Sequence, residues 1–326
     1  MIYKFKPNRV YRAYYGGKRI DALCGKEVCE DSRFPEEWLA SSVRAFNPGR
    51  EDVVEGISIC EDGTPFSEIL GDKKLPILVK LLDAAERLFI QCHPTIPFAK
   101  QHFGSEFGKT ECWYIISADE DACVYIGFKE EITRAEWETC FKEQNTERML
   151  ELMHKLKVEA GDLVFVQGGV PHAIGGGCLL CELQEPTDLM VIPERSSKSG
   201  ITLPDIKLHG GLGFDKMFDC FEYDGYTEEE LKNRFVRHPI LENDTFVPIV
   251  DETLTDKFRM DGLKLKDGTT VDFKENFAVV VAISGGGKIT SGEKNIEFSA
   301  GEGFYISENS GALKFEGNAE LIICRR

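Results

Sequence analysis

Short apolar runs separated by glycine-rich turns fill the chain beyond about residue 240 and restrict that region to an antiparallel β architecture. The expected strands are residues 277–283, 293–298 and 304–306, and the turns between them are 284–287 and 300–303. Many short strands at regular spacing predict a jelly roll over residues 241–326. Because His238 is the last histidine, this region is predicted to lack a histidine-based metal site and to have a structural, capping or dimerising role.

Side chains able to bind a metal occur in an earlier, β-prone part of the chain. Gln91 and His93 follow the apolar run 88–90, which is predicted to be a β-strand, and positions i and i+2 of a strand face the same side. Glu111 lies in another β-prone run, and His172 lies among glycines. Two imidazoles, a carboxylate and an amide oxygen suit a divalent metal with open coordination positions, as in a catalytic site.

Each histidine taken alone has a second interpretation, because a lone histidine on a strand is more often a surface or core residue than a ligand. The order of the motifs favours the metal site. Gln91-Cys92-His93 is followed by Lys109-Thr110-Glu111-Cys112-Trp113-Tyr114 and then by Val170-Pro171-His172-Ala173-Ile174-Gly175. In this order the motifs resemble those of the type I mannose-6-phosphate isomerases, which are cupin-fold enzymes. The resemblance covers about residues 1–200 and includes residues 36–41, 75–84 and 182–184.

This resemblance implies a fold that is mainly β, with two cupin-type jelly-roll β-barrels and a small helical insertion in the first. The expected domains are a catalytic, metal-binding domain at residues 1–240, with its insertion at about 131–157, and a second domain at 241–326. The implied reaction interconverts mannose 6-phosphate and fructose 6-phosphate through an enediol(ate). One divalent ion is expected, with zinc preferred over manganese, iron or cobalt. Its implied ligands are Gln91, His93, Glu111 and His172.

Helix-capping signals agree with the helical insertion. Thr133 and Glu136 have the spacing of a capping box, in which each residue satisfies a backbone N–H of the first turn. Asn145 is expected to cap a second helix, with Met149 and Met153 on its buried face. We therefore expect two short helices before the sheet resumes.

Charge and hydropathy exclude two classes of partner. The net charge of −17 and the pI near 4.9 argue against nucleic-acid binding, because such a protein repels phosphate backbones. No apolar run has the length of a signal-peptide core or a bilayer span, which predicts a cytoplasmic protein with no membrane partner. A monomer or a homodimer is expected, and the sequence leaves the choice between them open. A small-molecule sugar phosphate would then need a local basic pocket. The candidates for that pocket are Lys80, Lys109, Arg195 and Lys198.

Isomerisation requires a group that removes a weakly acidic proton beside a carbonyl and returns it to the neighbouring carbon, with a pKa near the working pH. The resemblance assigns this role to Glu182. A second interpretation makes Glu182 an acceptor that holds a ligand histidine. Lys109 shares a strand face with Glu111 and is expected to donate to a substrate oxygen, or else to be a solvated lysine at a strand end.

Two positions depart from the family pattern. Ile192 stands where type I isomerases carry an arginine implicated in catalysis, and Phe89 stands where the family usually has a serine near the substrate. Arg195 can replace the missing guanidinium only if Pro193 bends the chain toward the site. Three interpretations follow: a mannose-6-phosphate isomerase, an isomerase of a different sugar, or a metal-bound cupin that binds a sugar without catalysis.

Overall fold

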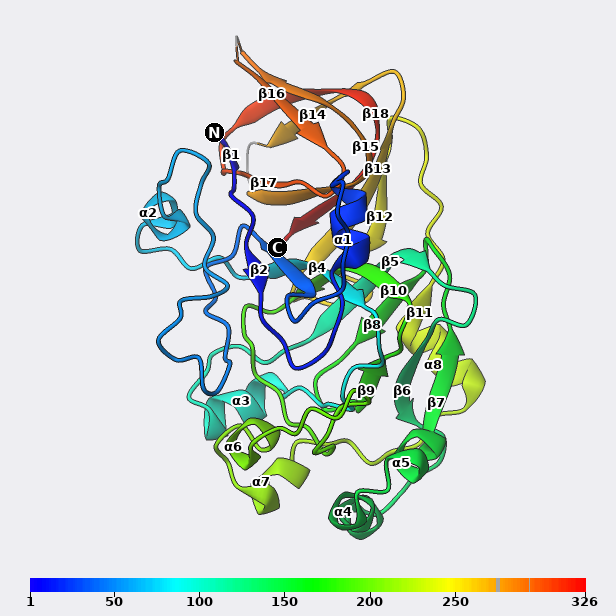
Figure 1. Cartoon of the computed structure of the whole chain (residues 1–326). Helices are drawn as coiled ribbons and strands as arrows, with labels where there is room; N and C mark the ends of the chain where they lie inside the picture. Colours follow the sequence, from blue (N-terminus) through cyan, green and yellow to red (C-terminus); the bar gives the residue numbers. More distant parts are fainter. Residues whose placement is uncertain (274–275, 293) are drawn as a thin grey trace.

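In the computed structural model, which describes residues 1–273, 276–292 and 294–326, the chain is mainly β, as predicted. The described strands form an eight-stranded, a seven-stranded and a three-stranded sheet. Figure 1 shows the eight-stranded sheet at the top and the seven-stranded sheet below it, with most helices at the opposite end of the molecule.

The eight-stranded sheet is built almost entirely from the C-terminal part of the chain. Its strands are β1 (Ile2–Lys4), β12 (Phe246–Val250), β13 (Arg259–Leu265), β14 (Thr269–Phe273), β15 (Ala278–Ser291), β16 (Lys294–Ser299), β17 (Gly303–Ile306) and β18 (Gly311–Arg325). The main path runs β1-β17-β15-β18-β13-β12, with β14 paired to β18 and β16 paired to β15. Buried apolar side chains from these strands form a core that includes Leu263, Phe304 and Ile323.

One strand of this sheet comes from the other end of the sequence. In β1, Ile2 lies opposite Ile306 of β17 in antiparallel register, and Figure 1 shows the N-terminus among the C-terminal strands. The expected division at residue 240 is therefore crossed by β1. The division of the remaining chain stays a prediction.

The expected turn at Gly285-Gly286-Gly287 is wrong, because β15 runs through these glycines without interruption. The register with β18 shifts between Ala282 and Ser284, and Gly285 then adopts a φ of +66°. A Cβ on Gly287 would lie 2.2 Å from the carbonyl oxygen of Glu316. The glycines therefore mark a β-bulge and a close approach of two backbones, which the sequence pattern does not distinguish from a turn. The start of the strand expected at 293 lies outside the described residues.

The seven-stranded sheet carries Glu36, Lys80, Glu111 and Glu182, four of the charged residues discussed below. Its strands are β2 (Arg9–Val10), β3 (Glu36–Leu39), β4 (Leu78–Ala84), β5 (Glu111–Ala118), β8 (Leu163–Val166), β10 (Cys178–Gln184) and β11 (Val236–Arg237). The order is β11-β8-β5-β10-β4-β3-β2. Glu182 on β10 lies opposite Lys80 on β4, and Lys80 lies opposite Trp38 on β3. Directly opposed residues share a face of a sheet, so this row of side chains projects to one side.

The three-stranded sheet brings His172 to the same region. Its strands are β7 (Met153–Lys157), β6 (Cys123–Phe128) and β9 (His172–Ile174). The run 88–90, expected to be a strand, forms no ladder. Only Gln91 and Cys92 of this segment make isolated bridges, to His172 at the start of β9 and to Val191 in a loop, so no continuous strand pairing holds its backbone.

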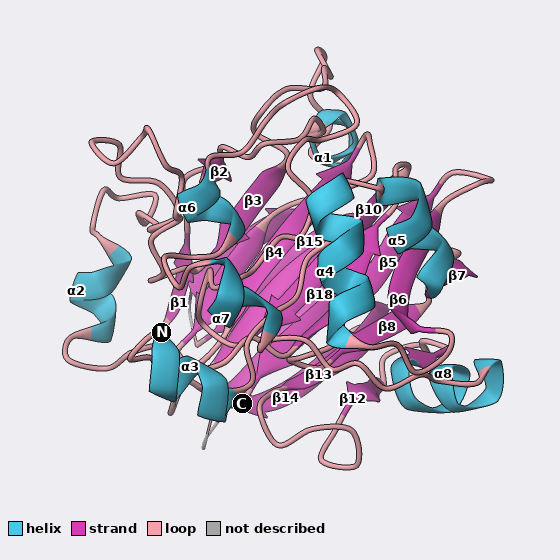
Figure 2. Ribbon diagram, turned by 90° about the horizontal axis from the view of Figure 1, so that it is seen from below, coloured by secondary structure: helices cyan, strands magenta, loops and turns pink. Residues whose placement is uncertain are grey.

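Eight short helices occur among the described residues. They are α1 (Lys18–Leu23), α2 (Phe66–Leu70), α3 (Ile96–His102), α4 (Arg134–Glu143), α5 (Thr146–Leu152), α6 (Asp205–Leu208), α7 (Phe214–Phe218) and α8 (Glu228–Phe235). Figure 2 shows α4, α6 and α7 in front of the strands when the molecule is seen from its lower end. None of these helices is long and apolar enough to cross a bilayer.

The capping predictions are confirmed at both helices of the insertion. Thr133 and Glu136 form a capping box at the start of α4, and the Asn145 side chain accepts from a backbone N–H in α5. The placement of Met153 on this second helix is wrong. The helix ends at Leu152, and Met153 takes an extended conformation and pairs with β6. Met153 is nevertheless buried, which is why its apolar character fitted a helical pattern.

We predict that Gly287→Ala lowers the free energy of unfolding by about 1–3 kcal/mol, because the new methyl group must displace the backbone of β18. Urea denaturation compared with Ser291→Ala, a matched change in the same strand, tests this prediction. Equal midpoints for the two variants would show that the backbones separate freely.

Candidate metal centre and substrate cavity

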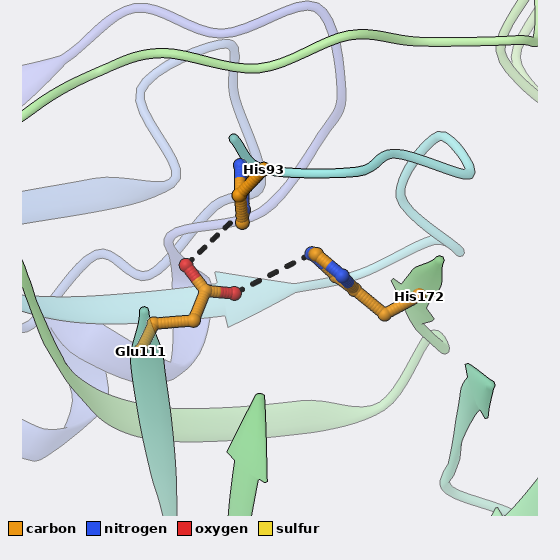
Figure 3. A group of neighbouring side chains, drawn as sticks. All are labelled: His93, Glu111 and His172. Carbon is orange, nitrogen blue, oxygen red and sulfur yellow. Dashed lines mark ion pairs between the residues drawn. The ribbon is translucent and has the colours of Figure 1, made fainter. Parts of the chain in front are cut away.

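His93, Glu111 and His172 converge from three separate segments. Glu111 Oε2 lies 3.2 Å from His93 Nε2, and Glu111 Oε1 lies 3.4 Å from His172 Nε2. Figure 3 shows the carboxylate between the two imidazole rings. All three side chains are buried, and one ligand atom from each lies within 4.8 Å of the others. The structure therefore brings together three of the four predicted ligands.

Backbone carbonyls fix the orientation of both imidazoles. His93 Nδ1 lies 3.0 Å from the carbonyl oxygen of Leu189, and His172 Nδ1 lies 2.9 Å from that of Val170. Each Nδ1–H can donate a hydrogen bond to its carbonyl oxygen. Nε2 of each imidazole then carries no hydrogen, and its lone pair is directed toward Glu111. Among the described residues, His172 Nε2 is buried and has no hydrogen-bond partner. Two lone pairs and a carboxylate facing one another fit a cation, and carbonyl-anchored histidines are typical of metal sites.

The protonation states agree with that donor set. Burial lowers the pKa of His172 to about 3, and burial together with the charge of Lys109 lowers the pKa of His93. Burial opposes ionisation of Glu111, yet the Lys109 charge and the neighbouring histidines hold its pKa well below the usual value. Neutral imidazoles and an ionised carboxylate are the forms that bind a metal.

Lys109 lies directly beside this group. Its Nζ is 2.8 Å from Glu111 Oε2 and 2.8 Å from His93 Nε2. Lys109 lies just before β5 and not on it, yet its side chain meets that of Glu111 as predicted, and the lysine is 3% exposed rather than solvated. Lys109 therefore contacts both the carboxylate and one imidazole of the metal candidate.

Gln91 lies next to His172 because the two backbones form a pair of hydrogen bonds, each 2.9 Å long. Gln91 also lines a cavity of about 240 Å³, together with Lys109 and Glu182. The cavity therefore opens beside the metal candidate. The ligand role of Gln91 stays a prediction.

Glu182 is buried in the wall of this cavity. Its Oε1 lies 3.0 Å from Lys80 Nζ and 3.8 Å from Lys109 Nζ. Burial raises its pKa, an effect that the two lysines oppose and the nearby Glu111 charge reinforces. A carboxyl group whose pKa is raised toward neutrality, beside a candidate metal, suits proton transfer.

Phe89 and Ile192 are among the apolar side chains that line the cavity. Both positions were expected to be polar from the family pattern. The cavity wall is therefore apolar where a hydroxyl and a guanidinium were expected.

The structure corrects the expectation that Arg195 faces the site. Its guanidinium packs over the rings of Phe141 and Phe214, 5.1 Å from each centroid, and Arg195 Nη1 lies 2.5 Å from Asp205 Oδ1. Arg195 is not among the residues that line the cavity, and Lys198 is exposed and also absent from its wall. Among the residues predicted to form the basic pocket, Lys80 and Lys109 line it.

Sequence reasoning missed Arg12, Glu36 and Asp188, all of which line the cavity. Arg12 Nε lies 2.9 Å from Glu36 Oε1, and Arg12 Nη2 lies 3.1 Å from Asp188 Oδ1. Residues 36–41 entered the sequence analysis only as part of the family resemblance, but Glu36 joins this buried network and also accepts from Trp38 Nε1 at 2.6 Å. A carboxylate within a strand that packs a tryptophan was the available signal for Glu36. Arg12 lies in a segment without a distinguishing pattern.

We predict that His172→Ala weakens zinc binding at least about 100-fold. Mutation of a residue that only supports a metal ligand already lowers metal affinity roughly 10–100-fold, and loss of a ligand should lower it further. Metal content after dialysis against a graded chelator measures the effect, and His238→Ala is the control because His238 is exposed. Equal zinc retention by the two variants would exclude His172 from the ligand set.

Comparisons with known proteins agree with the geometry. Residues 252–325 match the family described as mannose-6-phosphate isomerase, cupin domain. The chain is 30% identical over 269 residues to mannose-6-phosphate isomerase ManA of Bacillus subtilis (strain 168), covering 79% of this chain and 77% of that protein.

Solved structures share the fold. A mannose 6-phosphate isomerase from Bacillus subtilis superposes with a TM-score of 0.74 at 21% identity, covering 99% of each chain. A mannose 6-phosphate isomerase bound with zinc and yttrium superposes with a TM-score of 0.72 at 14% identity, covering 100% of this chain and 99% of the other.

Proposed function

Because the chain belongs to the type I mannose-6-phosphate isomerase family of the cupin superfamily, we propose that it interconverts mannose 6-phosphate and fructose 6-phosphate. The observation that carries this proposal is the convergence of two neutral imidazoles and an ionised carboxylate beside a cavity that Glu182 and Lys109 also line.

The finer architecture belongs to the same proposal. The seven-stranded and three-stranded sheets would form one cupin-type jelly roll, and the eight-stranded sheet would form the second. Antiparallel pairing throughout these sheets and the family match over residues 252–325 support this arrangement.

We further propose that one divalent ion, zinc by preference, is held by Gln91, His93, Glu111 and His172. The buried, unpartnered Nε2 of His172 supports this assignment. Such an ion would stabilise negative charge that develops on the substrate oxygens during isomerisation.

In the proposed reaction, the Glu182 carboxylate takes the proton from carbon 2 of the open-chain aldose and returns it to carbon 1. A second proton passes from the hydroxyl on carbon 2 to the oxygen on carbon 1, so the enediol(ate) is converted to the ketose without net oxidation. Lys109 would donate a hydrogen bond to one of these oxygens. Its position 2.8 Å from Glu111 and 3.8 Å from Glu182 supports that role.

The alternative in which Glu182 holds a ligand histidine lacks support, because the Nδ1 atoms of His93 and His172 face backbone carbonyls. A structural alternative is that Glu182 only balances the charge of Lys80. The 3.0 Å ion pair with Lys80 is common to both interpretations. They differ in the expected effect of removing the carboxylate, because a structural partner affects folding and a proton carrier affects turnover.

A different sugar is the second candidate substrate. The observation in its favour is the apolar wall at Phe89 and Ile192, which removes contacts to an anionic group. The chain would then isomerise an unphosphorylated or differently phosphorylated sugar on the same scaffold. A non-catalytic sugar-binding cupin would have the same wall and no turnover.

A coupled assay of the zinc-loaded protein on mannose 6-phosphate and on free mannose tests these proposals. We expect turnover of the phosphate that disappears in His93→Ala. Turnover of free mannose alone would favour the second candidate, and turnover of neither sugar would remove both from consideration as substrates.

We predict that Glu182→Gln lowers kcat about 10²- to 10⁴-fold while zinc content is unchanged, because the amide cannot carry the proton. Steady-state kinetics with Glu242→Gln, an exposed carboxylate, as the control measure this effect. A kcat within about twofold of the control value would assign Glu182 to the structural role.

A further inference from the structure

The cavity has a charge opposite to that of the whole protein. Its basic lining residues are Arg12, Arg33, Lys80, Lys109 and Lys207, whereas three acidic residues line it. The chain as a whole carries a net charge of −17. A local excess of positive charge in a low-dielectric cavity attracts an anion that the overall field repels.

Most of this positive charge is already paired within the protein. Arg12 pairs with Glu36 and Asp188, as described above. Lys80 pairs with Glu182, and Lys109 pairs with Glu111. These cations balance buried carboxylates, so they contribute little net attraction for a ligand.

Lys207, on α6, differs from these cations. Its side chain is 9% exposed, and its Nζ donates to the carbonyl oxygen of Phe46 at 2.7 Å. Within the described residues, Lys207 forms no ion pair with a carboxylate oxygen inside 4.0 Å. The ammonium group also lies 5.0 Å from the centroid of the Phe46 ring, and the charges of Asp188 and Glu36 act on it only from beyond ion-pair distance. It therefore keeps N–H donors that no carboxylate of the protein accepts.

Arg33 is the other cavity cation without a carboxylate partner, but its surroundings differ. It donates to the carbonyl oxygen of Arg12 and to the hydroxyl of Tyr11, and it is partly exposed. A charge in contact with solvent attracts an anion much less than a buried charge does. Lys207 is therefore the stronger anchor.

We propose that Lys207 binds the phosphate group of the sugar substrate and so determines specificity for a phosphorylated sugar. This inference rests on the proposed function and names the group that recognises the substrate. It accounts for a cavity that is apolar at Phe89 and Ile192, because the anion is held by a lysine from a later segment of the chain. An ammonium group binds phosphate as a point charge.

The charge of Lys207 is sensitive to pH in the neutral range. Burial lowers its pKa to about 8, an effect that Asp188 and Glu36 oppose and that Arg12 and Lys109 reinforce. The lysine is thus an ammonium at pH 7 and loses its charge as the pH rises through about 8. Phosphate binding in the free enzyme should weaken over the same range.

The experiment compares Lys207→Met with Lys198→Met, a matched change at an exposed lysine outside the cavity. We expect Lys207→Met to raise KM for mannose 6-phosphate roughly 10- to 100-fold, the range for a charge-assisted hydrogen bond. Its zinc content and its kcat/KM for free mannose should match the control values. An unchanged KM for the phosphate would overturn the proposal, as would an equal loss with both sugars.

Two further measurements keep the proposal testable if Lys207→Met does not fold or if neither sugar is turned over. Calorimetric titration with glucitol 6-phosphate and with glucitol measures binding without catalysis, and wild type should bind the phosphate more tightly.

Lys207→Arg keeps its positive charge at high pH. Its affinity for glucitol 6-phosphate should therefore persist above pH 8, where the affinity of wild type falls. Equal affinity of wild type for glucitol 6-phosphate and glucitol would reject the anchor, and absence of turnover with retained phosphate binding would reject the isomerase function alone.

Discussion

The charged side chains of Arg12, Glu36, Lys80 and Glu182 are buried in the wall of the cavity. Each of them depends on an opposite charge that another segment of the chain supplies. Arg12 is matched by Glu36 and Asp188, and Lys80 is matched by Glu182. Removing one partner of such a pair leaves an uncompensated buried charge, which is strongly destabilising. Because β10 lies between β4 and β5, its pairing register sets Glu182 opposite Lys80. The register of one strand therefore determines both the stability of the cavity and its chemistry.

Residues that lie close together in sequence, or that follow strand periodicity, were predictable. The alternation of strand side chains related Lys109 to Glu111, and the capping-box spacing located the start of α4. The convergence of His93 with His172 came from the family pattern, since no local rule relates residues so far apart.

The residues that sequence reasoning missed or misplaced share one physical cause, which is tertiary packing. Arg12 and Lys207 reach the cavity from segments before and after the strands that form its base, and only tertiary packing brings them there. Arg195 was expected near the site because it follows Ile192 closely, yet stacking on Phe141 and Phe214 holds it elsewhere. Gly287 was assigned to a turn because glycine is typical both of turns and of positions where two backbones approach closely. In each case the deciding interaction is one that the local sequence does not contain.

The pairing of Ile2 with Ile306 has a consequence for how the molecule assembles. Closing so long a loop is entropically costly, and contacts of this range form slowly. During synthesis β1 leaves the ribosome long before its partner strand β17 does. Until they meet, one edge of β17 has unpaired backbone N–H and C=O groups, which can recruit a strand from another chain. The addition of β1 at the edge of the eight-stranded sheet is thus a step at which folding competes with aggregation.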